Sequence, residues 1–389
     1  MIIGIDGNEA NNKFRVGVGK YAYELLWALY RKIDIKNEDK MSFQIYLQNT
    51  KMHDLPDERE WWTYVKIGSP GWWIEKDLMP YLWSNKLRKN KPPDVFLSPN
   101  HYSPIPIPIP SVISIMDLAF HKYPLYFKKS DLFKLKYWTY FSVHQAKKIL
   151  TISHFTKNEI TKYYNIDKSK IEVTYLGIDK VKFNKYVKDK KDEIKKLEIK
   201  YGMKGPYLLF IGTAQPRKNL IRLIEAFHEF IKNHEDIKLV IAGMISEGRG
   251  GWMYDSTFKI ISDLDLKDRI IMTGYISDKD LPILIGGCKA LLMPSLYEGF
   301  GLPVIEAMSI GIPVVISKNS SLEEIGGKVA IYIDNPYNID SIVTSLDKLI
   351  SLGKNELNRK IDEGYKWVRQ FNWDNTAKKT LTVLNAFKQ

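Results

Sequence analysis

Between residues 207 and 316, short apolar segments alternate with segments whose apolar residues recur at helical spacing. The predicted strands are 207–211, 237–242, 269–273, 289–293 and 312–316, and the predicted helices are 219–233, 252–265, 279–286 and 303–310. Strands that are joined through helices pair in parallel, because the chain must cross back over the sheet. The alternation therefore restricts this part of the chain to an α/β fold, with a parallel sheet and helices on both faces.

The N-terminal half repeats the pattern less regularly. A strand at 2–6, a turn with two glycines and a helix at 20–32 form a first βα unit. Further strands are predicted at 43–47, 94–97, 111–115 and 149–152. Residues 103–110 (SPIPIPIP) are expected to run extended outside the sheet, because proline has no N–H to donate.

A chain of 389 residues is too long for one ordinary core, so two domains are expected. Residues 184–204 are rich in lysine and poor in strongly apolar side chains, which predicts a partly helical linker. We expect an N-terminal Rossmann-like domain at 1–190 and a C-terminal one at 200–371. Two such domains place a ligand at the carboxyl ends of their strands.

The composition indicates the cellular compartment in which the chain can fold. A single cysteine, Cys288, excludes an internal disulfide, so the chain can fold in a reducing cytoplasm. Residues 1–10 have neither the basic nor the long apolar region of a signal peptide. No apolar run approaches the roughly 18 residues that span a bilayer. We therefore expect a cytoplasmic protein.

Residues 298–306 (EGFGLPVIE) place two carboxylates around a glycine-rich turn that leads into a helix. Pro303 fits the start of a helix, and Gly299 and Gly301 let a ligand approach the backbone closely. The N-terminal end of a helix favours phosphate, whereas Glu298 and Glu306 favour hydroxyl groups. A nucleotide sugar carries both groups, although an acidic first turn that only complements the helix dipole fits the same residues.

Two further loops follow predicted strands. After the strand at 207–211, the loop from Gly212 contains Arg217 and Lys218 just before a helix, where both cations can neutralise a diphosphate. A solvated basic turn is the alternative. Gly17 and Gly19 form a second candidate phosphate loop after the first strand, although the G-x-G pattern alone has low specificity.

The positive charge is concentrated in the N-terminal half. Residues 1–200 contain 35 Lys and Arg against 23 Asp and Glu, and seven of the ten Trp. The segment 128–141 (KKSDLFKLKYWTYF) mixes both types most densely, which suits an anionic membrane surface. An ordinary helix with a lysine face and an aromatic core face is the alternative. No nucleic-acid-binding motif accompanies the segment, so nucleic acid is not an expected partner.

Taken in order, these segments resemble the retaining glycosyltransferases of family 4. The matching segments are RVGVGKYAYEL (15–25), ISIMDLAF (113–120), TISHFTKNEI (151–160), TYLGIDKVKF (174–183), PRKN (216–219), EGFGLPVIEAM (298–308), SSLEEIGG (320–327) and FNWDNTAKK (371–379). Eight matches in the right order over nearly the whole chain are specific. The resemblance implies the GT-B fold, in which two Rossmann-like domains have parallel sheets facing an interdomain cleft and the helix at 372–389 packs back on the first domain. It also implies that the domain at 1–190 binds the acceptor and that the domain at 200–371 binds the nucleotide-sugar donor.

The resemblance also implies how a nucleotide-diphospho-sugar donor is bound. Glu298 would accept hydrogen bonds from hydroxyls of the donor sugar, and Glu306 from the ribose diol. The backbone amides of Phe300, Gly301 and Leu302 would support the sugar and the phosphate.

The remaining implied contacts are to the diphosphate. Arg217 and Lys218 would bind it, with Gly212 in the same loop. Gly17 and Gly19 would close over the phosphates from the other domain.

The family uses no metal and no cofactor beyond its substrate. The sequence agrees, because the D-x-D patterns at 263–265 and 278–280 do not follow predicted strands. The seven His show no ligand spacing either.

One position departs from the family pattern. Met116 precedes Asp117 where the family has His-Asp, so the imidazole expected near the 6-hydroxyl of the sugar is absent. His121 and His154 lie nearby in the sequence and are candidate substitutes, although a packing or surface role is more typical of such residues. Asp117 remains a candidate catalytic residue, because it can orient the end of the strand.

The implied reaction is retaining transfer of a hexose to a hydroxyl of a glycan or lipid-linked saccharide. GDP-mannose is the favoured donor, since the segments look most like bacterial mannosyltransferases of polysaccharide assembly. The alternatives are a UDP-sugar-dependent glucosyl or GlcNAc transferase, a nucleotide-sugar 2-epimerase, and an inactive GT-B partner or scaffold protein. The basic N-terminal domain suggests peripheral contact with the inner face of the membrane.

Overall fold

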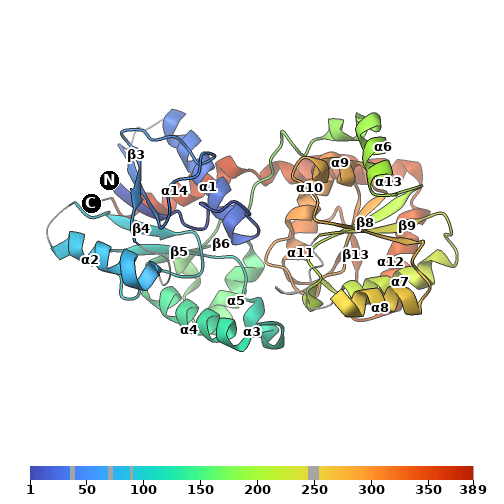
Figure 1. The fold of residues 1–389 in the computed structure, drawn as a ribbon, viewed down its shortest axis with the longest axis horizontal. Coiled ribbons are helices and arrows are strands. Elements are labelled where there is room, and N and C mark those ends of the chain that lie inside the picture. The colour runs from blue at the N-terminus through green and yellow to red at the C-terminus, as the bar shows by residue number, and fades with distance from the viewer. Residues whose placement is uncertain (36–39, 69–72, 88–90, 244–253, 389) are drawn as a thin grey trace. The chain divides into compact units, whose positions relative to one another are not determined.

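The chain forms two compact units, each built around one parallel sheet (Figure 1). A computed structural model describes residues 1–35, 40–68, 73–87, 91–243 and 254–388. The first unit contains residues 1–177 together with 372–389, and the second contains 178–371.

The first unit has a seven-stranded sheet in the order β3-β2-β1-β4-β5-β6-β7 with all neighbours parallel. Its strands are β1 (Ile2–Asp6), β2 (Ser42–Leu47), β3 (Trp62–Lys66), β4 (Val95–Ser98), β5 (Ser111–Ile115), β6 (Lys148–Thr151) and β7 (Ile171–Val173). Its helices are α1 (Val18–Ile35), a π-helical turn (Ile74–Leu78), α2 (Met79–Leu87), α3 (Ala119–Lys122), α4 (Lys129–Gln145), α5 (His154–Tyr164) and α14 (Trp373–Asn385). Helices α1 and α14 cover one face of the sheet, and α2 to α5 cover the other (Figure 1).

The segment 103–110 contains no strand, as the prolines predict. The strands β3 and β7 were not predicted. β3 begins at Trp62, whose side chain is completely buried and packs against Tyr30 and Phe43. This tryptophan therefore belongs to the core rather than to an aromatic surface.

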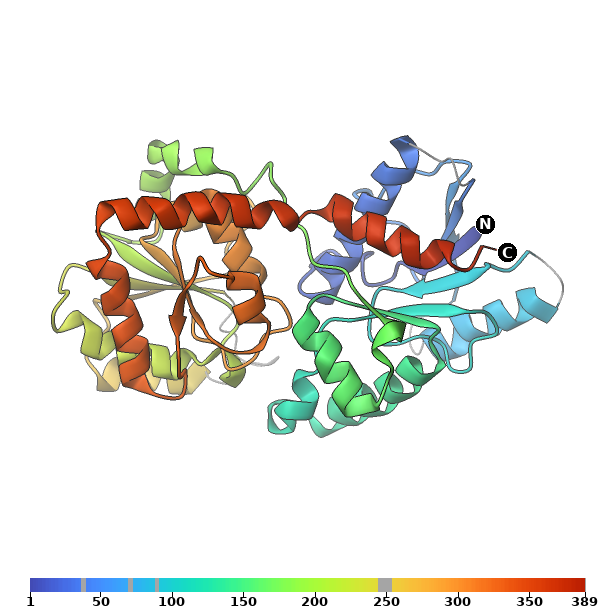
Figure 2. The ribbon, with the colours of Figure 1, turned by 180° about the vertical axis from the view of Figure 1, so that it is seen from behind.

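The helix α14 packs against α1, as Figure 2 shows. The rings of Trp373 and Tyr21 lie 6.3 Å apart, and Lys379 Nζ donates to the carbonyl of Val173 at 2.9 Å. A Cβ atom on Gly177 would lie 2.3 Å from the backbone nitrogen of Trp373. Only glycine fits there, so the end of the chain is tightly fastened to the first unit.

The second unit has a six-stranded sheet in the order β10-β9-β8-β11-β12-β13, again with all neighbours parallel. Its strands are β8 (Tyr207–Ile211), β9 (Lys238–Ala242), β10 (Ile270–Gly274), β11 (Ala290–Met293), β12 (Val314–Ser317) and β13 (Ile331–Ile333). Its helices are α6 (Lys191–Lys200), α7 (Leu220–Ile231), α8 (Tyr254–Asp263), α9 (Asp280–Gly287), α10 (Leu302–Ile310), α11 (Ser320–Gly326), α12 (Ile339–Ser351) and α13 (Lys354–Trp367). All five predicted strands are present, whereas β13 was missed. Residues 252 and 253 of the predicted helix 252–265 lie outside the described residues.

The lysine-rich segment 184–204 packs on the second unit. It consists mainly of a 3₁₀ turn at Lys185–Asp189 and helix α6. The Lys188 ammonium donates to the carbonyl of Gly311 at 3.2 Å, and a Cβ on Gly286 would lie 2.8 Å from the Val187 side chain. These contacts place the division between the units at residues 177 and 178, ahead of the lysine-rich segment.

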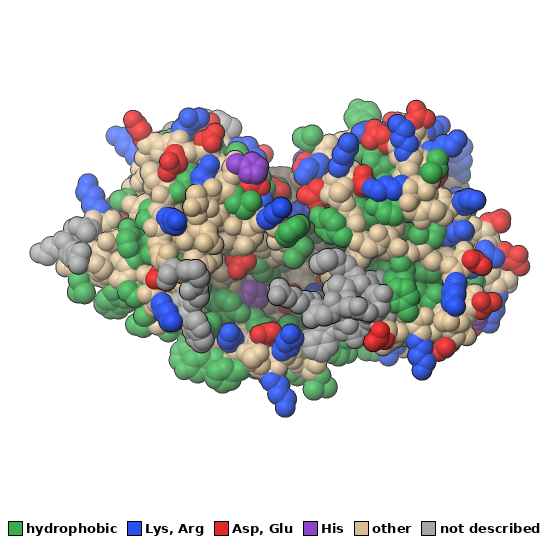
Figure 3. Space-filling view, in the orientation of Figure 1, with side chains coloured by type: hydrophobic (Ala, Val, Ile, Leu, Met, Phe, Trp, Pro, Cys, Tyr) green, Lys and Arg blue, Asp and Glu red, His purple; other side chains and the backbone are tan. Residues whose placement is uncertain are grey.

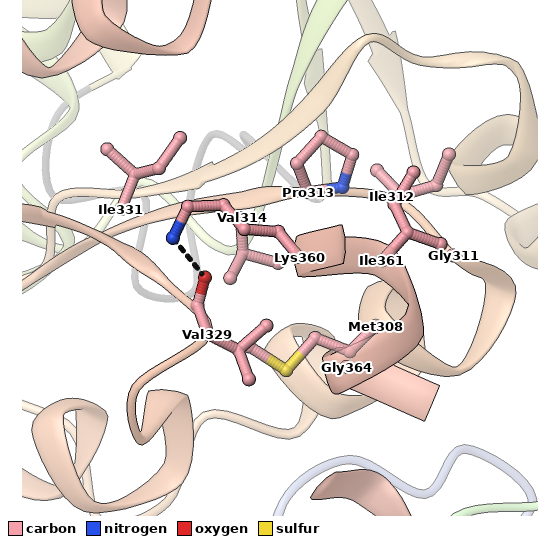
Figure 4. Close-up of a pocket in the computed structure, with 10 residues that line it drawn as sticks. All are labelled: Met308, Gly311, Ile312, Pro313, Val314, Val329, Ile331, Lys360, Ile361 and Gly364. Atoms are coloured by element: carbon pink, nitrogen blue, oxygen red, sulfur yellow. Dashed lines mark hydrogen bonds between the residues drawn. The ribbon is translucent and has the colours of Figure 1, made fainter. Parts of the chain in front are cut away.

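Helix α13 covers the outside of the second unit with one packing gap (Figure 4). The gap is about 10 Å³ and is lined by apolar side chains of α10, β12 and α13, including Met308 and Ile361. Lys360 runs along it and donates from Nζ to the carbonyl of Val329 at 3.2 Å. A space of this size holds one water at most, so this is a packing defect rather than a ligand site.

Candidate functional site

The loops after β8 and β11 lie side by side at the carboxyl edge of the second sheet, because these two strands are neighbours. The backbone N–H of Leu296 donates to the carbonyl of Arg217 at 2.7 Å. The buried side chain of Asn219 donates to the carbonyls of Pro294 and Pro336 at 3.1 and 2.6 Å. Asn219 has a φ of +62°, a conformation that asparagine tolerates better than most residues. It joins three loops at this edge.

Glu298 lies between the two cations of the loop after β8. Its Oε1 is 2.6 Å from Lys218 Nζ, and its Oε2 is 3.1 Å from Arg217 Nη1. The Glu298 side chain is 8% exposed, and those of Lys218 and Arg217 are 14% and 18% exposed. Burial alone raises the pKa of Glu298, but the charges of Lys218 and Arg217 outweigh it and hold the pKa below its usual range. The cluster is thus a nearly buried carboxylate that carries its negative charge at neutral pH.

Arg217 is fixed by further contacts. Its Nε donates to Gln215 Oε1 at 2.9 Å, and its Nη1 donates to the carbonyl of Tyr297 at 3.0 Å. A guanidinium held on two sides is pre-organised, so little side-chain entropy is lost when it binds an anion.

Helix α10 begins directly after this cluster. Gly301 precedes the helix with a φ of +101°, and a Cβ at this position would lie 2.7 Å from Leu322 Cδ2. The hydroxyl of Ser321 donates to the carbonyls of Glu298 and Phe300 at 2.8 and 3.1 Å. The turn is therefore fixed by Ser321, and α10 begins at Leu302, four residues after Glu298.

The second glutamate of the motif lies one turn into α10. The Glu306 side chain is 4% exposed, and Pro303 occupies the first turn of the helix as predicted. Both glutamates of the motif are thus nearly buried in the same unit.

The loop after β8 starts at Gly212, next to the loop after β9. The Gly212 N–H donates to the carbonyl of Ala242 at 2.9 Å, and Gly243 is so close that a Cβ on it would lie 2.1 Å from the Gly212 carbonyl. Gly243 also has a φ of +135°. The glycines let these two loops touch beside the cation cluster.

In the first unit, the predicted glycine loop follows β1 and ends in α1. Gly17 has a φ of +52°, and a Cβ on it would meet nothing within 4 Å. The loop is anchored by Arg15, which forms a bidentate pair with Asp54 at 2.5 and 2.9 Å. A Cβ on Gly19 would lie 3.1 Å from the carbonyl of Glu9. The backbone at Gly17 is thus open on its outer side, whereas Gly19 packs inward.

Asp117 follows β5 in the first unit, and its Oδ1 accepts the backbone N–H of Ala119 at 3.0 Å. The adjacent Met116 is buried, and its N–H donates to Nε2 of His101 at 3.3 Å. His101 follows β4, the neighbour of β5. Burial lowers the pKa of His101, although the Asp117 charge opposes this effect. An imidazole therefore lies beside Met116 and Asp117 that the sequence did not point out.

The two histidines proposed as substitutes have other surroundings. The His121 ring is stacked on Tyr163 at 4.5 Å, and its Nε2 is 2.8 Å from the Tyr164 hydroxyl. Burial and the nearby Lys136 charge lower the pKa of His121 to about 4. His154 is exposed at the start of α5, with its ring 6.1 Å from that of Tyr175.

Within the described ranges, no group of three or more His, Cys, Asp or Glu side chains is placed to hold a metal ion. None of the helices in the same ranges is long and apolar enough to cross a bilayer.

Comparison with known proteins places this sequence among the glycosyltransferases. The model of the group 1 glycosyl transferases matches residues 180–367, and that of glycosyltransferase family 4 matches 45–182. The O-antigen chain mannosyltransferase B of Escherichia coli is 30% identical over 298 residues, which span 76% of this chain and 74% of the relative. The O-antigen chain mannosyltransferase RfbU of Salmonella typhimurium is 30% identical over 63% of each chain.

Among solved structures, the sucrose-phosphate synthase of Thermosynechococcus elongatus superposes with a TM-score of 0.75 over 99% of this chain and 98% of its own, at 15% identity. This likeness concerns the fold alone. It confirms the predicted GT-B class with one parallel sheet in each unit.

Proposed function

Since this chain belongs to the family 4 glycosyltransferases, we propose that it transfers a hexose from a nucleotide-diphospho-sugar to a hydroxyl of a glycan or lipid-linked saccharide, with retention at the anomeric carbon. GDP-mannose is the proposed donor. Two relatives at 30% identity are named mannosyltransferases, which supports mannose as the transferred sugar.

The observation that carries the proposal is the cluster of Glu298, Arg217 and Lys218 beside the start of α10. Two fixed cations and a helix N-terminus suit a diphosphate, whose charge increases as it leaves. The nearly buried carboxylate between the cations suits sugar hydroxyls, which donate to it. When the donor binds, Arg217 and Lys218 bind the diphosphate, and Glu298 keeps its charge and accepts from the sugar.

The proposed transfer needs no covalent enzyme intermediate and no metal. The bond between the anomeric carbon and the diphosphate oxygen breaks, and the acceptor oxygen attacks on the face that the diphosphate leaves. The proton of the acceptor hydroxyl passes to the departing phosphate oxygen. Glu306 binds the ribose diol, and the amides of Phe300, Gly301 and Leu302 support the sugar and phosphate. Gly17 closes over the phosphates.

Incubation with a panel of GDP- and UDP-sugars, followed by nucleotide release and by melting shifts, tests the proposal. GDP-mannose should give the largest signal, and EDTA should not reduce it. A preference for a UDP-sugar would replace the donor with the UDP-sugar-dependent alternative. A chain that binds nucleotide diphosphates without turnover would favour an inactive GT-B partner, and a chain that binds none would exclude a transferase. Glu298→Ala and Lys218→Ala should each abolish turnover.

We also propose that the exposed face of α4 contacts an anionic membrane surface. Three aromatic side chains on this face are exposed: Phe133 is 67% exposed, and Tyr137 and Tyr140 are about half exposed. Hydrophobic side chains gather over this helix in Figure 3, with Lys and Arg close by. Aromatic and lysine side chains together suit the interface of an anionic bilayer. Flotation with anionic liposomes should carry the protein upward at low salt, and a lack of flotation there would refute this contact.

A further inference from the structure

The backbone of Glu298 is held by two serines at the start of α11. The Glu298 N–H donates to Oγ of Ser320 at 3.2 Å, and the hydroxyl of Ser321 donates to the Glu298 carbonyl at 2.8 Å. Helix α11 follows β12, the neighbour of β11, and it lies beside α10 (Figure 1). Both polar groups of the Glu298 backbone are thus bonded to residues 22 and 23 positions further along the chain.

The hydroxyl of Ser320 has a fixed orientation. It donates to Oδ1 of Asn319 at 3.2 Å, so a lone pair of its oxygen is turned to the Glu298 N–H. Asn319 Nδ2 in turn donates to the carbonyl of Leu296 at 3.3 Å. The Leu296 N–H donates to the carbonyl of Arg217. A chain of hydrogen bonds therefore connects Ser320 with the loop that carries the two cations.

Ser320 has a backbone conformation that is unfavourable for its residue type. Its φ is +52°, in the left-handed region where the Cβ atom of an L-residue is too close to the following carbonyl. Asn165, Asn219 and Asp265 also have positive φ values, but Asn and Asp tolerate this region better than serine does. Strain of this kind persists where the surroundings hold the residue in place, and it concentrates at functional sites.

The strained conformation has a geometric consequence. Consecutive side chains of a regular helix or strand point in different directions. The left-handed turn at Ser320 allows its hydroxyl and that of Ser321 to reach the same residue, Glu298. The carboxylate of Glu298 is bound at the same time by Arg217 and Lys218. Glu298 is thus fixed at its backbone by the serines and at its carboxylate by the cations.

We propose that Ser320 is a positioning residue for Glu298. Its hydroxyl holds the Glu298 N–H, so that the carboxylate meets the hydroxyls of the donor sugar in one orientation. The contact of Glu298 with the sugar rests on the proposed transferase function. Glycine could replace a serine that only allows the chain to turn at this φ, whereas it cannot replace a hydroxyl that positions Glu298.

Three variants of Ser320 separate positioning from stability. Ser320→Ala and Ser320→Gly both remove the hydroxyl, but only glycine relieves the positive φ, so Ser320→Gly should melt about 2–4 °C above Ser320→Ala. Both should lower kcat/KM for the nucleotide sugar by the same factor, about tenfold. Ser320→Thr keeps a hydroxyl and should retain most of the turnover, although its branched side chain makes a positive φ less favourable. Turnover that follows the melting temperatures of the three variants would overturn the proposal.

Asp265→Gly is the matched control for the relief of strain. Asp265 has the same φ of +52° and is exposed in a turn after α8 in the same unit. The variant should leave kcat/KM unchanged. A loss of turnover as large as that of Ser320→Gly would assign the effect to glycine itself and would likewise refute the role of the hydroxyl.

A measurement without donor separates this proposal from the transferase function. If Ser320 positions Glu298, loss of the hydroxyl weakens the ion pairs of Glu298. Ser320→Ala should therefore lower the midpoint of urea unfolding less in a Glu298→Gln background than in wild type. Equal shifts in the two backgrounds would exclude the positioning role. Unequal shifts without turnover of any nucleotide sugar would support the positioning of Glu298 and refute only the transferase.

Discussion

Replacing Glu298 by glutamine removes the negative charge that pairs with Arg217 and Lys218 and keeps the shape of the side chain. Breaking a buried ion pair by removing one partner typically costs about 3–5 kcal/mol, because the other charge is left uncompensated. Lys218 and Arg217 retain 14% and 18% exposure, so water screens part of this cost. We therefore expect the lower end, about 3 kcal/mol.

Calorimetry measures this loss. In a unit of roughly 150–250 residues, 1 kcal/mol shifts Tm by about 2–4 °C, so Glu298→Gln should lower the Tm of the second unit by about 6–12 °C. Glu356→Gln is the matched control, because Glu356 is exposed at the start of α13 in the same unit. Its effect should stay within about 0.5 kcal/mol.

The pH dependence of stability tests whether the negative charge of Glu298 stabilises the folded state. The folded-state pKa of Glu298 is lowered, so the stability that its charge contributes is fully present above the pKa of a free glutamate, about 4.3. It is lost as the pH falls through the lowered value. The difference between wild type and Glu298→Gln should therefore be constant from pH 6 to 8 and shrink below pH 5.

A nucleotide diphosphate should reverse part of the loss. In wild type the diphosphate competes with the Glu298 carboxylate for the two cations, whereas in Glu298→Gln this competing charge is gone. GDP should thus raise the Tm of the variant more than that of wild type, although the variant has no turnover. Equal stability of the two proteins, or a smaller GDP shift in the variant, would refute the reasoning.

Five further substitutions probe the scaffold and the site. Gly301→Ala should lower the free energy of urea unfolding by about 2–3 kcal/mol, because of its φ of +101° and the contact of the new Cβ with Leu322. Gly202→Ala, with a φ of +67° and open space around it, should lower it by about 1 kcal/mol. Equal losses in the two variants would show that the Leu322 contact has no effect. Asn219→Ala should cost about 2 kcal/mol, since two carbonyls lose their donor, and Asn219→Gly should cost less by the relief of φ; the reverse order would contradict the strain argument. Met116→His should leave turnover intact or raise it, and a large loss would refute the site model.

Most strands could be predicted because each is a short apolar run with clear boundaries. The exceptions have physical causes. β7 and β13 are only three residues long, too short for a periodicity to appear. β3 combines a buried Trp62 with exposed and half-buried neighbours, so its composition resembles that of a surface segment.

The alternative interpretation of α4, a helix with a lysine face and an aromatic core face, is wrong about which side chains are buried. The structure buries its small side chains Thr139, Ser142 and Val143 and exposes four of its five aromatic ones, Trp138 being half-buried. Hydropathy ranks an aromatic side chain above threonine or serine, so the sequence assigned the core to the wrong face. The neighbouring elements, whose packing requires small side chains along that face, decide which face is buried.

The site combines local structure, which could be predicted from the sequence, with contacts between distant positions, which could not. The glycine turn before α10 is formed by consecutive residues, so it could be predicted from the sequence. The contact of Lys218 with Glu298 joins positions 80 apart and depends on β8 and β11 being neighbours in the sheet. From the sequence, Lys218 is expected to bind the diphosphate of the donor and Glu298 the hydroxyls of its sugar. In the structure the two side chains form an ion pair with each other.

His101 was missed for a similar reason. A parallel sheet gathers at one edge the residues that follow each of its strands, so a side chain needed there can come from any neighbouring loop. The candidate substitutes His121 and His154 are close to Asp117 in the sequence, whereas the loop after β4, which carries His101, is close to it in space. Because Nε2 of His101 accepts the Met116 N–H, the neutral ring carries its proton on Nδ1. The backbone of Met116 thereby orients an imidazole that its own side chain does not provide.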